Sequence, residues 1–181
     1  MRVMPRFTYT TRLAALGDGN FLRAMLYEAA SPLRRQRPPR DELLATPPVA
    51  AFVEGWGRPG DHGIVAESEL EPVGAAWFRV FPDDDLEGGF IGGETPEMLI
   101  ALTPEHRGKG LGGLLLSALL DKAREEQKRS MGLNVSRANL PAVSLFRRHG
   151  FEVVREHHGI LTMQAVLSEG GAGEARVPGP Q

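Results

Sequence analysis

A short run of glycines and cations is the part of the sequence that indicates chemistry most directly. Residues 107–112 read Arg-Gly-Lys-Gly-Leu-Gly, and they lie between a short apolar run and the strongest helical pattern in the chain. The first N–H groups of a helix lack intrahelical partners, and the helix dipole places about half a positive charge there. Glycines lack Cβ and allow positive φ, so the backbone can close around an anion. We therefore predict a pyrophosphate site, with added charge from Arg107 and Lys109.

Two well-known phosphate-binding patterns fit this loop poorly. The Walker pattern requires an upstream glycine where this chain has Thr103, and Ser or Thr after the lysine where it has Gly110. The dinucleotide pattern GxGxxG is formally present at Gly108, Gly110 and Gly113. However, these glycines do not follow the strand directly, and the next predicted strand does not end in the acidic residue that binds ribose. A nicotinamide dehydrogenase is therefore the weakest alternative.

The elements that must position this loop form a mixed α/β (α+β) fold. The predicted order is β-α-α-β-β-β-α-β-α-β-β, which gives a central mixed sheet of about seven strands flanked by helices. The unit from residue 98 to residue 136 is a parallel strand–helix–strand crossover, whereas the early strands can pair antiparallel. Strands are predicted at 7–12, 63–68, 73–81, 98–102, 131–136, 151–156 and 160–167. Helices are predicted at 21–30, from 41 with a resumption at 49–56, at 111–128 and at 141–149, with Asn20, Asp41 and Asn139 as N-caps.

Length and composition narrow the class of protein. The chain has 181 residues, so we predict one domain over residues 1–167 and a disordered Gly/Pro/Ala-rich tail over 168–181. With 21 basic and 23 acidic residues, the chain lacks the basic excess of a nucleic-acid binder. The absence of cysteine fits a reducing compartment, and we expect a cytoplasmic protein with no membrane partner. No metal site is predicted, because the adjacent His157 and His158 should point apart.

Two motifs in this order resemble those of the GNAT (GCN5-related) N-acetyltransferases. Residues 107–112 resemble the acyl-CoA signature R/Q-x-x-G-x-G/A, and residues 139–151 resemble the later motif N-x-x-A-x-x-L-Y-x-x-x-G-F. The resemblance extends over about residues 6–167 and is strongest from residue 98 to residue 151. It implies that acetyl-CoA binds in a cleft where strands 98–102 and 131–136 splay apart. It also implies direct acetyl transfer to an amine, without a covalent enzyme intermediate.

The resemblance assigns individual residues to the cofactor. Backbone groups of Leu102 and Thr103 would pair with the pantetheine arm, and N–H groups of residues 107–112 would hold the pyrophosphate. The expected cofactor-contacting residues are Leu102, Thr103, Arg107, Gly108, Lys109, Gly110, Leu111, Gly112, Asn139, Ser144 and Phe146. Phe146 departs from the family pattern, because it replaces a tyrosine proposed to protonate the departing thiolate. Another group or water would act instead, or the thiolate, with a reference pKa of about 8.5, would leave without help.

The attacking amine must be neutral, and two carboxylates are candidates for the base that deprotonates it. A typical amine has a pKa near 10, so a base or a chain of waters must accept a proton. Glu94 and Glu97 stand at the start of the 98–102 strand, where the family often places a carboxylate. The alternatives are a structural role at the strand edge for Glu97 and a solvated loop charge for Glu94.

We therefore predict an N-acetyltransferase that transfers the acetyl group of acetyl-CoA to an amine of a small molecule or peptide. The competing class is a non-catalytic acyl-CoA-binding module that acts as a sensor or scaffold, which Phe146 favours. The acceptor cannot be predicted, because variable loops build that part of the site. Homodimers are common in the family, and a homodimer stays open here. The acidic, glycine-rich insertion at 82–96 receives no role.

Overall fold

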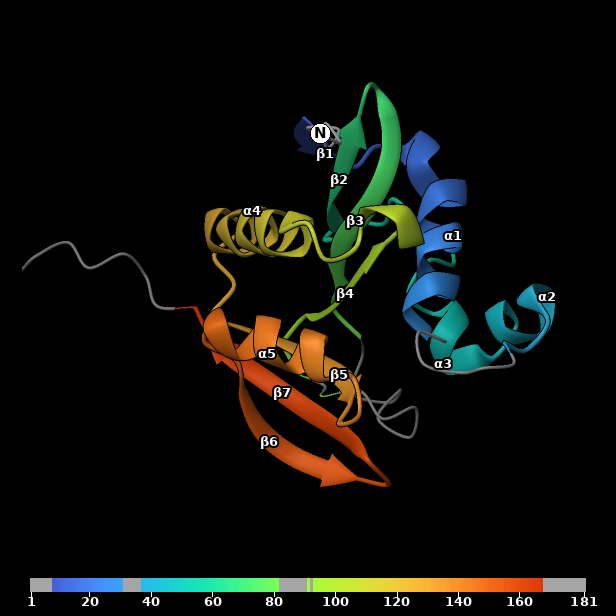
Figure 1. The fold of residues 1–181 in the computed structure, drawn as a ribbon. Helices are drawn as coiled ribbons and strands as arrows, with labels where there is room; N and C mark the ends of the chain where they lie inside the picture. Colours follow the sequence, from blue (N-terminus) through green and yellow to red (C-terminus); the bar gives the residue numbers. More distant parts are fainter. Residues whose placement is uncertain (1–7, 31–36, 82–90, 92, 168–181) are drawn as a thin grey trace, which may run out of the picture.

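The computed structural model describes residues 8–30, 37–81, 91 and 93–167, which fold around one seven-stranded sheet. The strand order is β1-β2-β3-β4-β5-β7-β6, and only the β4–β5 pair is parallel (Figure 1). The strands are β1 (Tyr9–Leu13), β2 (His62–Ser68), β3 (Glu71–Arg79), β4 (Glu97–Leu102), β5 (Ser130–Ser136), β6 (Glu152–His157) and β7 (Ile160–Val166). The predicted mixed α/β fold and its single parallel crossover are confirmed.

Helices cover both faces of the sheet. Helix α4 (Leu111–Glu125) packs against β2, β3 and β4 and buries all of its leucines except Leu114, while α1 (Gly19–Ala30) covers the opposite face (Figure 1). Helix α5 (Leu140–Arg148) shares the core of α4 through Val143 and Phe146. The short helices α2 (Arg40–Leu44) and α3 (Pro47–Ala50) lie beside the end of α1. None of the described helices combines the length and apolar character that crossing a membrane requires.

Helix boundaries are where the predictions were least accurate. Of the helix predicted at 49–56, only Val49 and Ala50 are helical: α3 spans Pro47–Ala50, and turns follow it. A helix could not continue through Gly55 in any case, because Gly55 and Gly57 have φ values of 59° and 101°, outside the right-handed helical region. The helix predicted to reach residue 128 ends at Glu125, since Gln127 has a φ of 55°.

Two of the three predicted N-caps were wrong. Helix α1 begins at Gly19 and α2 at Arg40, so Asn20 and Asp41 lie inside the first turn. Asn139 is an N-cap as predicted, and its Oδ1 accepts a hydrogen bond from the N–H of Ala142 at 3.4 Å.

The expectation that His157 and His158 point apart was also wrong. Their ring centroids lie 4.0 Å apart, because His158 occupies the turn between β6 and β7 with a φ of 47°. The predicted tail at 168–181 and residues 82–90 and 92 of the insertion lie outside the described residues.

A buried arginine fixes the turn after α3 to the sheet. The guanidinium of Arg79 donates to both carboxylate oxygens of Asp61, at 2.8 and 2.7 Å, and to the carbonyl oxygens of Ala51, Glu54 and Gly55. The side chains of Arg79 and Asp61 are 0% and 3% exposed. Burial alone would raise the pKa of Asp61, but the hydrogen bonds and charge of Arg79 lower it overall.

We expect Arg79→Ala to lower the free energy of unfolding by about 3–5 kcal/mol, because it leaves Asp61 charged, buried and unpaired. The control is Arg12→Ala, which removes a guanidinium that is 39% exposed and paired with Asp18 and Glu67. Screening by solvent should keep that loss at or below about 1 kcal/mol. Urea denaturation measures both values, and equal losses would contradict the role given to Arg79.

Candidate active site

The sheet opens between its two parallel strands. Strands β4 and β5 pair only at Glu97 and Gly132, and beyond that point they separate. The separation that the family resemblance implied is therefore present. Figure 1 shows the two halves of the molecule on either side of this gap, with β1–β4, α1 and α4 in one half and β5–β7 and α5 in the other.

The β4 backbone presents alternate residues to this gap. The N–H of Thr103 donates to the carbonyl of Val73, at 2.9 Å, so odd-numbered positions of β4 direct their backbone groups toward β3. The carbonyl of Pro96 accepts from the N–H of Gly132 at 2.9 Å, on the β5 side. Backbone groups at positions 98, 100 and 102 therefore face the gap. Of the two predicted pantetheine contacts, Leu102 has its N–H on this side, whereas the N–H of Thr103 is bonded to β3.

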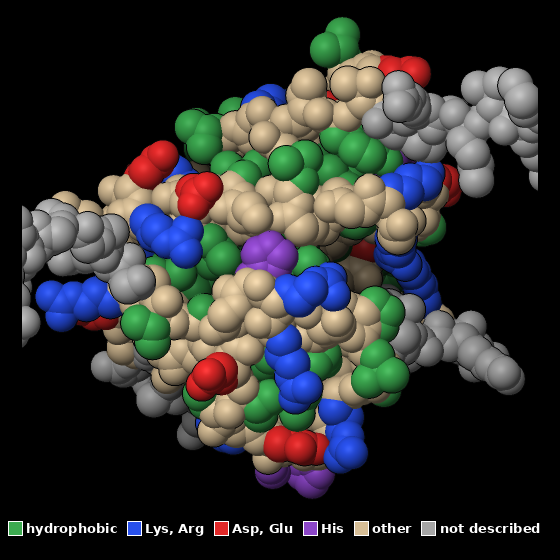
Figure 2. All heavy atoms as spheres, turned by 60° about the vertical axis from the view of Figure 1, so that its left-hand side comes forward, with side chains coloured by type: hydrophobic (Ala, Val, Ile, Leu, Met, Phe, Trp, Pro, Cys, Tyr) green, Lys and Arg blue, Asp and Glu red, His purple; other side chains and the backbone are tan. Residues whose placement is uncertain are grey.

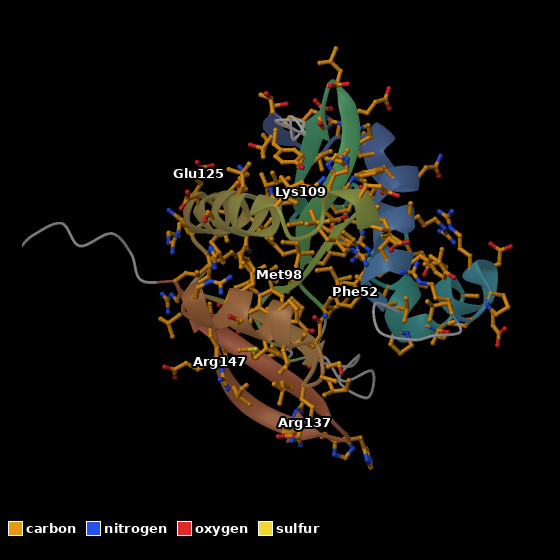
Figure 3. The ribbon with its side chains drawn as sticks, in the orientation of Figure 1. Phe52, Met98, Lys109, Glu125, Arg137 and Arg147 are labelled. Carbon is orange, nitrogen blue, oxygen red and sulfur yellow. The ribbon has the colours of Figure 1, made fainter. Side chains whose placement is uncertain are left out.

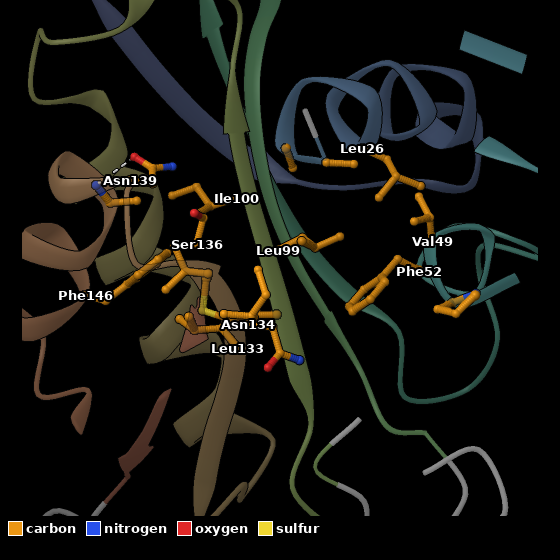
Figure 4. A pocket seen from close by; sticks show the side chains of 17 residues that line it. Leu26, Val49, Phe52, Leu99, Ile100, Leu133, Asn134, Ser136, Asn139 and Phe146 are labelled. Atoms are coloured by element: carbon orange, nitrogen blue, oxygen red, sulfur yellow. Dashed lines mark hydrogen bonds between the residues drawn. The ribbon is translucent and has the colours of Figure 1, made fainter. Parts of the chain in front are cut away.

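A cavity of about 410 Å³ occupies the gap and extends to both faces of the sheet. On one side Ile100 meets Ser136, Asn139 and Phe146. On the other side Leu99 points toward α1, α3 and the turn that follows α3 (Figure 4). Figure 3 gives the wider view, with Met98 beside the gap and Lys109 at the N-terminal end of α4. The cavity therefore connects the α5 side of β4 to the α1 side.

The predicted anion loop has the backbone conformation that such a site requires. Gly110 is the N-cap of α4 with φ 82° and ψ −6°, and no side chain among the described residues caps the helix. Gly108 has a φ of 70°. A Cβ at either glycine would meet no atom within 4 Å, so positive φ rather than lack of space favours glycine. The N–H groups of Leu111 and Gly112 start the helix without intrahelical acceptors.

The two predicted cations of the loop are engaged by nearby oxygens. Arg107 Nη2 donates to Glu28 at 2.6 Å and its Nε donates to the carbonyl of Leu102 at 3.2 Å. Glu28 also accepts two bonds from Arg37, at 2.7 and 3.0 Å, and the hydrogen bond from Arg37 is the largest cause of its lowered pKa. Lys109 Nζ donates to the carbonyl of Glu105 at 2.6 Å. Both cations of the loop therefore already have hydrogen-bond partners, and Arg107 is also paired with a carboxylate.

The three residues predicted from the second motif have different positions. Asn139 lies at the cavity as well as capping α5. Phe146 also lines the cavity, is buried, and packs against Phe151 with ring centroids 5.7 Å apart. Ser144 is exposed outside the cavity lining, and its Oγ accepts from Arg148 at 2.8 Å. The geometry thus gives Ser144 no support as a cofactor contact.

Of the two candidate bases, Glu97 is buried beside the cavity and Glu94 is exposed. Glu97 is 1% exposed, and its carboxylate accepts hydrogen bonds from the N–H of Ile91 and from Nδ2 of Asn134, the latter at 3.4 Å. Burial raises the pKa of Glu97 to about 7, although the Ile91 bond and the charge of Arg155 lower it in part. Glu94 lines a separate hollow with Thr95 and residues 127–130.

Hydrogen-bonded polar side chains that were not predicted from the sequence orient the amide of Asn134 beside Glu97. Asn134 lines the cavity, and its Oδ1 accepts a hydrogen bond from Thr162 at 2.7 Å, which turns the amide nitrogen toward Glu97. Arg155 Nη2 donates to the Thr162 hydroxyl at 3.5 Å. The sequence did carry a signal for these residues, because Asn134 and Thr162 are polar residues inside the largely apolar strands β5 and β7.

A family profile described as "Acetyltransferase (GNAT) family" matches residues 24–151. The chain belongs to the GNAT family. It is 41% identical over 110 residues to the uncharacterized N-acetyltransferase YobR of Bacillus subtilis strain 168. The matched region is 59% of this chain and 44% of YobR. The chain is also 35% identical over 118 residues to streptothricin acetyltransferase of Streptomyces lavendulae, a match that covers 61% and 60%. The chain thus spans about half the length of these curated relatives.

Solved structures agree with the GNAT fold. The yncA acetyltransferase of Salmonella typhimurium, described with its cofactor acetyl-CoA, has a TM-score of 0.65 and 26% identity. That match covers 93% of this chain and 99% of yncA. GNAT acetyltransferases use acetyl-CoA, as predicted. The residues fit this cofactor, because the uncapped start of α4 is suited to a diphosphate and the open edge of β4 to an amide-containing arm.

Proposed function

We propose that this GNAT chain transfers the acetyl group of acetyl-CoA to an amine of a small molecule or peptide. The observation that carries the proposal is one continuous cavity. It extends from the open edge of β4 to a second, apolar end, with the carboxylate of Glu97 buried beside it. A module that only binds acyl-CoA does not need a cavity on both faces of the sheet.

The backbone supplies the binding and electrostatic groups. The N–H groups of Leu111 and Gly112 would hold the pyrophosphate, and N–H groups of β4 that face the gap would bind the pantetheine arm. Acetyl-CoA, when bound, supplies the acetyl group as an activated thioester. Negative charge develops on a carbonyl oxygen during acyl transfer, and the N–H of Ile100 or Met98 would stabilise it.

Glu97 is the proposed general base. With a pKa of about 7 it is partly ionised at neutral pH and can accept a proton. Glu97 does not line the cavity itself, so the proton would reach it through water beside Asn134. Phe146 has no proton to give, so water would protonate the thiolate, or the thiolate would leave unassisted. Glu94 is exposed and separate from this cavity, and its catalytic role remains a prediction with less support.

The test is acetyl-CoA consumption with a panel of amines. Streptothricin and L-methionine sulfone belong in the panel, because relatives carry the names streptothricin acetyltransferase and L-methionine sulfoximine/L-methionine sulfone acetyltransferase. We expect thiol release that depends on one class of amine. Acetyl-CoA at about 100 times its Kd should also stabilise the fold by about 2.7 kcal/mol, whereas NAD should not. Stabilisation without release for any amine would favour the non-catalytic module.

Whether the chain forms a homodimer stays open, and its cytoplasmic location stays a prediction. Figure 2 shows both acidic and basic side chains on one face of the molecule, with several Lys and Arg side chains near one another below its centre.

A further inference from the structure

The end of the cavity on the α1 side of β4 is apolar. Leu26 and Ala29 come from α1, Val49 from α3, Phe52 from the following turn and Leu99 from β4 (Figure 4). None of the described residues that line the cavity is acidic, basic or histidine. The anion loop continues from β4 into α4, and α4 packs on the other face of the sheet. The cofactor sites therefore leave this end for the acceptor.

Hydrogen bonds and ring packing hold Phe52 and its turn, which form part of this apolar end, in place. Trp77 Nε1 donates to the carbonyl of Phe52 at 2.9 Å. The rings of Phe52 and Phe81 pack edge to face, with their centroids 4.9 Å apart. Arg79 binds the carbonyl oxygens on either side of Phe52 along the same turn, at Ala51 and Glu54. The apolar surface is therefore preformed, and an acceptor can bury its own apolar surface there without first ordering the wall.

Among the residues that the structure describes, the two carboxylates near this end, Glu28 and Glu97, already accept hydrogen bonds. Glu28, on the same helix as Ala29, binds both Arg37 and Arg107. Glu97 accepts bonds from Ile91 and Asn134. Within the described part of the chain, a second charge on an acceptor would thus lose its water without gaining a strong partner.

We propose that the acceptor is a primary amine on a compact, uncharged apolar body, such as an alkyl or arylalkyl amine, rather than a polyamine or another polycation. This inference rests on the proposed function and adds the substrate class to it. The amine would lie toward the gap, and its apolar body would lie against Leu99, Phe52 and Val49.

The test compares pentylamine with 1,4-diaminobutane as acceptors. The two molecules have the same length, and an ammonium group replaces one methyl group. We expect kcat/KM to be at least about 100-fold higher for pentylamine, because the diamine must desolvate its second charge. From propylamine to butylamine to pentylamine, kcat/KM should rise about fourfold per methylene. The amine pKa is nearly constant in this series, so the rise reports burial of the apolar body.

Val49→Asp locates the effect in the cavity. It should lower kcat/KM for pentylamine at least tenfold and shrink the preference over the diamine. The control is Leu70→Asp, which adds the same charge at a residue that is 86% exposed in the β2–β3 turn, and it should change neither value.

Each contrary result identifies what has failed. Acetylation of the diamine at an equal or higher rate, or no dependence on chain length, would overturn the inference and leave the proposed function standing. If Val49→Asp kept the wild-type preference for pentylamine over the diamine, the placement of the acceptor's apolar body beside Val49 would be wrong. Stabilisation by acetyl-CoA with no amine acetylated would overturn the proposed function, and the inference with it.

Discussion

Gly110→Glu should raise the Kd for acetyl-CoA by at least 100-fold while leaving the fold nearly intact. A Cβ at Gly110 would meet no atom within 4 Å, so the cost to the fold comes from the positive φ rather than from a clash at the Cβ. The new side chain would place a carboxylate at the start of α4, where the N–H groups would hold the pyrophosphate. Two like charges about 4 Å apart near a protein surface repel by about 4 kcal/mol, which exceeds the energy of a 100-fold change. Titration calorimetry with acetyl-CoA measures the change directly.

The control for charge is Gly110→Ala. Gly110 has a φ of 82°, so both variants pay the same backbone cost of about 1–2 kcal/mol, but alanine adds no charge. We expect less than a tenfold rise in Kd for alanine. Wild-type affinity in Gly110→Glu, with a normal melting curve, would place the pyrophosphate elsewhere. Equal losses in both variants would mean that the conformation of the loop, rather than its charge, controls binding.

The anion loop could be predicted from sequence because its determinants are local. The glycine spacing, the apolar run of β4 and the leucines of α4 are all contained in residues 97–125. The same is true of the Asn139 cap, which bonds three residues along the chain. The order of strands and helices followed from such local patterns, whereas the starts of α1 and α2 and the ends of α3 and α4 were misplaced.

The pairing of charged side chains could not be predicted, because it depends on contacts distant in sequence. Arg107 is held by Glu28 from α1, and the anionic partner of Arg79 is Asp61 from the turn before β2. Nothing in the spacing of these residues indicates the pairing. The choice between Glu94 and Glu97 was open for a related reason, since only the pairing of Glu97 with Gly132 shows which carboxylate is covered.

The apolar end of the cavity, where we propose that the acceptor binds, is a product of tertiary structure alone. Leu26, Val49, Phe52 and Leu99 belong to four separate segments, and each fits an ordinary core position in its own segment. Other large aromatic residues nearby do not form this wall: Trp77 and Phe78 are fully buried, and neither they nor Trp56 line the cavity. The four side chains line a cavity only because the gap beside β4 interrupts the hydrophobic core at this place.

Glu97→Gln should lower kcat at pH 7 by about 100-fold, the lower end of what a general base contributes. Glutamine has nearly the same shape and can still accept a hydrogen bond from Ile91 or Asn134, but it cannot take a proton from the amine. In the wild type, kcat should rise with pH and level off above about 7, because the carboxylate must be ionised to act. The variant should lack this break. Glu94→Gln tests the other candidate base: a lower rate in Glu94→Gln, with an unchanged rate in Glu97→Gln, would assign the role to Glu94.

A stability measurement separates catalysis from a purely structural role for Glu97. Folding raises the pKa of Glu97 from an ordinary 4.5 to about 7, so the folded state binds more protons than the unfolded state between these values. Stability from this group is therefore present below about pH 4.5 and is lost as pH rises toward 7, by about 3 kcal/mol. Urea denaturation of Glu97→Gln should lack this loss.

If the variant lacks the loss but keeps the wild-type rate, Glu97 is buried for structural reasons alone, and water is the base. If both the stability profile and the rate change together, one buried carboxylate accounts for both. The pH at which wild-type kcat levels off should then coincide with the upper end of the stability change, because both would report the same ionisation in the folded protein. A kcat profile that levels off at another pH would assign the catalytic proton to a different group.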